Sequence, residues 1–108
     1  MKNNMLKLAI IALVIATAAI HLARGIPYGM LMFILNGLGY LGLVAALYLP
    51  QFKRYQTWVR WTLVVFTAVT IIGWIAIGDK TLVIGYVDKV IEIVLIALLL
   101  VENRGRAR

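Results

Sequence analysis

Three ionisable residues interrupt an otherwise apolar stretch near the end of the chain: Asp88, Lys89 and Glu92. On a helix, Asp88 and Glu92 are four residues apart and share a face, while Lys89 and Glu92 adjoin at a spacing of three. An ionised side chain near the centre of a bilayer costs about 2.5–3.5 kcal/mol on insertion scales, so three together could not face lipid. We therefore expect them to face protein or water and to pair.

Polar residues at matching depths occur on other apolar stretches. At a helical rise of 1.5 Å per residue, Asp88 and Glu92 lie about 10 and 16 Å from the outer end of their stretch, and Asn36 lies about 12–13 Å from the end of its own. We therefore predict one polar cluster in the outer half of the molecule. Its members are Asp88, Lys89, Glu92, Asn36, Tyr40, His21 and Arg24. Further candidates on the first and third stretches are Thr17, Thr67, Thr70 and Trp74.

Two interpretations of this cluster stay open. It could be a network of ion pairs and hydrogen bonds that fixes helix register. Because interhelical polar contacts in membranes average about 0.6 kcal/mol, such a network would contribute specificity more than stability. It could instead bind a proton, an ion or a small polar solute, because intramembrane carboxylates near a lysine and a histidine are components of proton relays and coupled transporters.

The composition argues against most enzyme classes. The chain has no cysteine and no serine, which removes thiolate and serine nucleophiles. Its single histidine cannot supply paired haem ligands, and no HExxH motif or histidine pair indicates a metal site. Acid–base catalysis would have to use His21, Asp88 or Glu92. We expect no enzymatic activity, no catalytic residue, no cofactor and no metal.

Four apolar stretches must position these residues. Hydrophobic residues make up 64% of the 108 residues, and about 20 apolar residues suffice to cross a hydrocarbon core about 30 Å thick. The predicted spans are 8–23, 28–49, 57–77 and 81–101. Because the connections are short, consecutive helices must be antiparallel neighbours. We expect an all-α membrane protein, with a single domain over residues 1–108 that forms an up-down bundle of four transmembrane helices. Pro27 should open the second helix, and Gly78 should end the third before a turn at Asp79 and Lys80.

The basic residues predict an orientation. One face of an up-down path would hold Lys2, Lys7, Lys53, Arg54, Arg60, Arg104, Arg106 and Arg108. The opposite face would hold only Arg24 and Lys80. This asymmetry predicts a multi-pass protein of the cytoplasmic (inner) membrane with both termini cytoplasmic, its basic face against anionic lipid headgroups rather than nucleic acid. Cleavage of the first stretch as a signal peptide, near Ala16-Thr17-Ala18, is the alternative that would leave three spans.

Small residues form a seam along the first stretch. Its members are Ala9, Ala12, Ala16, Ala19 and Ala23, at spacings of three and four. Such a period allows helices to approach closely. His21 lies on roughly the opposite side of the helix, so if His21 faces the interior, the seam faces another protein. Packing against a neighbouring span within the bundle is the alternative.

Three short strings carry a resemblance. They are His21-Leu22-Ala23-Arg24-Gly25, Asn36-Gly37-Leu38-Gly39-Tyr40 and Ile84-Gly85-Tyr86-Val87-Asp88-Lys89. In these strings the chain resembles small four-span prokaryotic integral membrane proteins grouped as a domain of unknown function. The resemblance implies a four-span fold and brings no activity, substrate or catalytic residue.

Taken together, the residues favour a non-enzymatic membrane protein that works as a homo-oligomer or as an accessory subunit of a larger membrane complex. The alternative is a minimal transporter or channel for a proton, an ion or a small solute, built on the Asp/Lys/Glu cluster.

Overall fold

The computed structural model describes residues 2–78 and 80–107, with side chains described for 4–78 and 80–104. Every regular element in these ranges is helical. The elements are α1 (Lys2–Gly25), α2 (Leu31–Tyr48), the short 3-10 helix η1 (Pro50–Tyr55), α3 (Gln56–Ile77) and α4 (Val83–Ala107). The predicted turn residue Asp79 and the side chains of Lys2, Arg106 and Arg108 lie outside the described residues.

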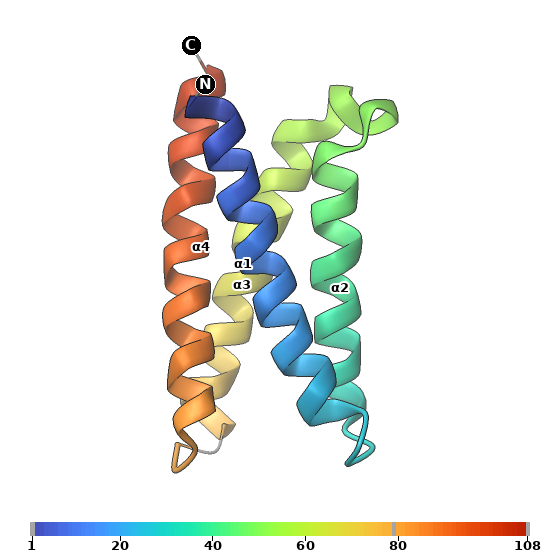
Figure 1. The fold of residues 1–108 in the computed structure, drawn as a ribbon, viewed down its shortest axis with the longest axis vertical. Helices are drawn as coiled ribbons and strands as arrows, with labels where there is room; N and C mark the ends of the chain where they lie inside the picture. Colours follow the sequence, from blue (N-terminus) through green and yellow to red (C-terminus); the bar gives the residue numbers. More distant parts are fainter. Residues whose placement is uncertain (1, 79, 108) are drawn as a thin grey trace.

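The four long helices form an elongated bundle with extents of 42 × 23 × 22 Å. Helix α1 packs beside α2 and α4, and α3 packs beside the same two helices. Within the described part of the chain, α2 and α4 therefore stand across the bundle from one another, as Figure 1 shows. The first turn of α1, the last turn of α4 and η1 lie at one end, and the α1–α2 and α3–α4 connections lie at the other (Figure 1).

Within the described residues, three helical segments are long and apolar enough to cross a membrane: Asn4–Gly25, Leu31–Tyr48 and Pro50–Ile77. Large apolar side chains cover the outside of the bundle; Met32 is 78% exposed and Ile77 is 90% exposed. Among the described residues, in contrast, five charged side chains are buried in the interior: Arg60, Asp88, Lys89, Glu92 and Glu102. An apolar outside around a polar inside is the distribution of a membrane protein.

The start of α2 differs from the prediction. The helix begins at Leu31 rather than near residue 28, because residues 26–29 form a turn in which Gly29 adopts a left-handed φ of 64°. The N–H of Met30 donates to the carbonyl of Gly25 at 2.9 Å and closes this turn. Pro27 therefore lies in the turn at residues 26–29 and not in the first helical turn of α2.

At the end of α3, Gly78 is the cap residue as expected, and its N–H donates to the carbonyl of Trp74 at 2.8 Å.

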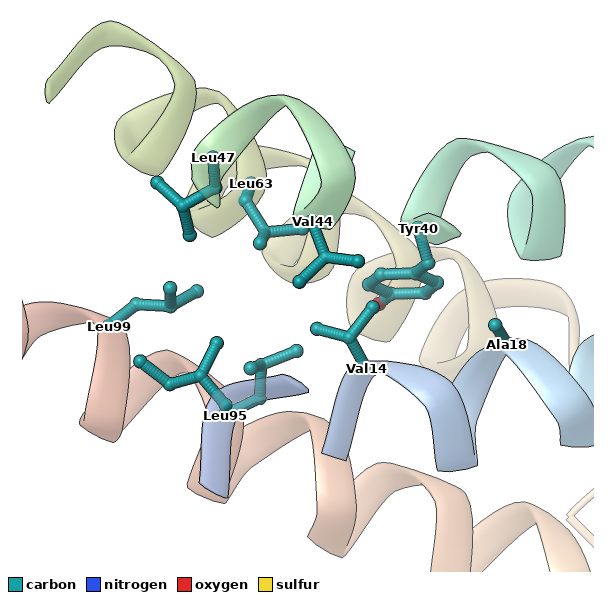
Figure 2. Close-up of a cluster of buried hydrophobic side chains, with 9 residues drawn as sticks. Val14, Ala18, Tyr40, Val44, Leu47, Leu63, Leu95 and Leu99 are labelled. Atoms are coloured by element: carbon teal, nitrogen blue, oxygen red, sulfur yellow. The ribbon is translucent and has the colours of Figure 1, made fainter. Parts of the chain in front are cut away.

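The apolar core is a layer contributed by all four helices. Its members are Ile10, Val14, Ala18, Tyr40, Val44, Leu47, Leu63, Leu95 and Leu99. Figure 2 shows the side chains of α2, α3 and α4 meeting those of α1 in this layer. On α4 the two core leucines lie between Glu92 and Glu102, so the layer separates two groups of buried polar residues.

Gly37 lets α2 approach α1 closely. A Cβ at this position would lie 2.7 Å from Cγ of Leu22 and 3.0 Å from the carbonyl oxygen of Ala18. Both atoms belong to α1, so any side chain on residue 37 would push the two helices apart.

We predict that Gly37→Ala lowers the free energy of unfolding by about 1–3 kcal/mol, the usual cost of overpacking an interface. Thermal unfolding of the purified protein in detergent measures the change. Gly42→Ala is the matched control, because a Cβ there meets nothing within 4 Å. Equal effects of the two substitutions would contradict the close α1–α2 approach.

Candidate functional site

Six buried side chains meet in the half of the bundle away from the termini, and we call them the polar cluster. They are Thr17 and His21 on α1, Tyr40 on α2, and Asp88, Lys89 and Glu92 on α4. Thr17, Tyr40 and Glu92 have no exposed surface, and the other three are at most 7% exposed. The spacing of four on α1, and of three and four on α4, gives each helix one polar face, and these faces meet where α1 packs against α4.

Asp88 receives contacts from three sides. The hydroxyl of Thr17 donates to its Oδ1 at 2.5 Å, and the ammonium of Lys89 lies 3.3 Å from its Oδ2. His21 Nε2 also faces Oδ2, at 3.6 Å. The carboxylate is therefore held between α1 and its own helix.

Glu92 has its own donors. The hydroxyl of Tyr40 donates to Oε2 at 2.6 Å, and Lys89 donates to Oε1. Thr17 Oγ1 lies 3.2 Å from Oε2, but its single proton is directed to the nearer oxygen of Asp88. Glu92 is thus paired with a lysine and a tyrosine, and its hydrogen bonds reach from α4 across to α2.

The ring of His21 is fixed in one tautomer. Its Nδ1 lies 2.7 Å from the carbonyl oxygen of Thr17, and a carbonyl only accepts, so Nδ1 carries the hydrogen. The ring of Phe33 lies 5.7 Å away, edge to face, and that of Tyr40 lies 5.9 Å away. These contacts leave Nε2 as the nitrogen that faces Asp88.

The charges of the polar cluster do not cancel when His21 is neutral. With both carboxylates ionised, they share one ammonium, and one negative charge is left in a buried site. The effective penalty for burying an uncompensated ion is several kcal/mol. A cation or a proton would remove this penalty.

The same side chains satisfy a geometric condition for a metal ion. One ligand atom from each of His21, Asp88 and Glu92 lies within 4.8 Å of the others. However, the ammonium of Lys89 contacts both carboxylates and already supplies the cation between them. We assign no metal to this site.

Two residues expected in the cluster lie elsewhere. Asn36 donates to the hydroxyl of Thr70 on α3 at 2.9 Å, and its Oδ1 is buried without a partner among the described residues. Arg24 is half-buried, with its guanidinium 5.1 Å from the centre of the Phe33 ring. Asn36 lies one turn from Tyr40 on nearly the same face of α2, but its amide is bonded to Thr70 on the neighbouring helix α3. Arg24 lies near the end of α1, two turns beyond Thr17 and away from the carboxylates of α4 in its recorded contacts.

A second buried group at the end with the termini was missed from the sequence. Arg60 Nε donates to Glu102 Oε1 at 2.9 Å, and Nη1 donates to Asn103 Oδ1 at 3.3 Å. The hydroxyl of Tyr48 donates to Glu102 Oε2 at 2.8 Å. Arg60 is 1% exposed, so it is a buried ion-pair partner and not the headgroup contact that the charge pattern indicated. The available signal was Glu102, an acid at the end of an apolar stretch.

The alanine seam lies on the side of α1 that turns away from the core. Ala12, Ala19 and Ala23 are exposed, and Ala9 and Ala16 are half-buried. The alanine that packs against α2 is Ala18, which is not part of the seam. Whether another protein covers the seam stays a prediction.

Comparison of the chain with protein-family models, curated proteins and solved structures gives no match. The resemblance to small four-span membrane proteins therefore stays an expectation, and the functional argument depends on the geometry.

We predict that Glu102→Gln lowers the free energy of unfolding by about 3–5 kcal/mol, because it leaves the buried guanidinium of Arg60 without a counter-charge. The double variant Arg60→Met/Glu102→Leu should recover most of this loss, since it removes both charges. Thermal unfolding in detergent checks both. A double variant no more stable than Glu102→Gln would contradict the buried-pair interpretation.

We also predict that Tyr40→Phe lowers the free energy of unfolding by about 1–3 kcal/mol, because it deprives the buried carboxylate of Glu92 of a donor. Tyr28→Phe is the control, since Tyr28 is 78% exposed. The same loss in both variants would mean that the Tyr40–Glu92 hydrogen bond contributes nothing.

Proposed function

We propose that the chain is a four-span protein of the cytoplasmic membrane that acts without catalysis, as a subunit of a homo-oligomer or of a larger membrane complex. The observation that carries the proposal is that the ionisable side chains of the polar cluster contact one another and are closed off from the surface. Each of its ionisable groups contacts another member, and all are buried. Such a network fixes α1, α2 and α4 relative to one another and offers no open surface to a substrate.

The placement of α4 supports four spans rather than three. Its ionisable residues Asp88, Lys89 and Glu92 are buried, whereas Val90 and Ile93 on other faces are 61% and 57% exposed. A helix with this distribution can lie in lipid with its charges turned inward. Lys53, Arg54 and Arg104 are exposed at the end that holds the termini, which supports a cytoplasmic position for that end.

The outer face of α1 supports an assembly. Exposed small residues allow a second helix to approach closely, and van der Waals packing of this kind drives helix association in membranes. In this proposal the seam at Ala12, Ala19 and Ala23 contacts a second copy or a larger membrane protein.

A transporter of protons or small cations is the second candidate. The specific observation in its favour is the contact between His21 Nε2 and Asp88, which carries an attraction only when a proton is present. Because the polar cluster is buried within one bundle, a transport path would need more than one copy of the chain.

Native mass spectrometry after gentle detergent extraction tests the first proposal. We expect an assembly larger than one chain. Ala12→Leu should reduce it towards the single chain, and Ala97→Leu, an exposed alanine on α4, should leave it intact. A single chain in the native protein would overturn the proposal. Proton flux in vesicles that Glu92→Gln abolishes without loss of fold would then favour the transporter.

A further inference from the structure

The contact between His21 and Asp88 is incomplete without a proton. Nδ1 of His21 donates to the carbonyl oxygen of Thr17 at 2.7 Å, so a neutral ring presents a lone pair at Nε2. That lone pair would face Oδ2 of Asp88, another acceptor, at 3.6 Å. Two acceptors attract one another only through a hydrogen between them.

The groups around His21 come from its own helix and from the two helices that pack against α1. Helix α1 supplies the hydroxyl of Thr17, which donates to Asp88. It also supplies Arg24, whose guanidinium lies over the ring of Phe33 at 5.1 Å. Helix α2 supplies Tyr40, whose hydroxyl is committed to Glu92. Helix α4 supplies Asp88, Lys89 and Glu92.

The two carboxylates of the polar cluster share the ammonium of Lys89 unequally. Lys89 donates to Glu92 and also lies 3.3 Å from Asp88 Oδ2. Glu92 has a second donor in Tyr40, so the lysine and the tyrosine together satisfy it. Asp88 is the carboxylate whose charge has no full counterpart among the described residues.

We propose that His21 Nε2 and Asp88 Oδ2 bind one exchangeable proton from water. The proton resides on Nε2, so that an imidazolium faces the carboxylate of Asp88 while Lys89 faces Glu92, and the polar cluster becomes neutral. Release of the proton to water leaves one negative charge between α1 and α4. The site holds a proton whether the chain works as a subunit or as a transporter.

Nuclear magnetic resonance of the full-length protein tests this site directly, because the chain contains a single histidine. Protein carrying ¹⁵N in the histidine ring, reconstituted in phosphatidylcholine vesicles, gives ring-nitrogen signals from His21 alone. We expect both nitrogens to be protonated at neutral pH. In alkaline solution Nε2 should lose its proton while Nδ1 keeps its own.

Asp88→Asn supplies the second arm of the experiment. Removal of the negative charge should leave Nε2 without a proton at the neutral pH where the native protein holds one. The double variant Arg60→Met/Glu102→Leu is the matched control, because it removes a buried carboxylate on the far side of the apolar layer together with its counter-charge and should leave the signals unchanged.

Three results would overturn the proposal: a ring protonated at Nε2 but not at Nδ1, a neutral ring at neutral pH, or a proton at Nε2 that never exchanges. If Asp88→Asn does not fold, the signals of the native protein alone decide. The assembly size, measured by native mass spectrometry, does not enter this test, so failure here and failure of the subunit proposal are distinguishable.

Discussion

Charge buried inside an apolar bundle is the constraint on which the rest of the structure depends. Asp88, Lys89 and Glu92 lie on a helix whose other faces are apolar and exposed, so α4 fits lipid only with this face turned inward. Once inward, the carboxylates need donors, and α1 and α2 supply them through Thr17 and Tyr40. The close approach of α2 to α1 at Gly37 follows from the same need for donors, since both helices must reach the carboxylates on α4.

Two tyrosines of α2 supply donors to buried carboxylates at two levels of the bundle. Helices α2 and α4 stand across the interior from one another, yet Tyr40 donates to Glu92 and Tyr48 donates to Glu102. A phenol is long and rigid enough to cross the interior with its polar atom at the tip. The two hydrogen bonds lie on either side of the apolar core layer, so they fix the register of α2 against α4 at both ends.

Much of the fold and of the polar cluster could be predicted from three features of the sequence: its hydrophobicity, the length of its connections and the depth of each polar residue along its helix. They predicted the four helices, a polar cluster in the half away from the termini and most of its members, because depth along a helix follows directly from residue number. Depth does not tell which neighbour a side chain faces, so Asn36 was placed with Asp88 although it bonds to Thr70. For the same reason Arg60 was taken as a surface charge. Its pairing with Glu102 becomes visible only once α3 is known to pack beside α4. The start of α2 was missed because Gly29, and not Pro27, sets the geometry of the turn.

The two buried polar groups differ in how their charges balance. Around Glu102, one arginine faces one carboxylate, and a tyrosine and an asparagine complete the hydrogen bonds, so that end is neutral with the side chains alone. In the polar cluster, one lysine faces two carboxylates, and the remaining contact joins a histidine nitrogen to Asp88. With its two carboxylates and its lysine ionised, the polar cluster is neutral only when one further proton is bound. The proposed proton site accordingly lies at the end of the bundle away from the termini, where α1 and α4 share the contact between His21 and Asp88.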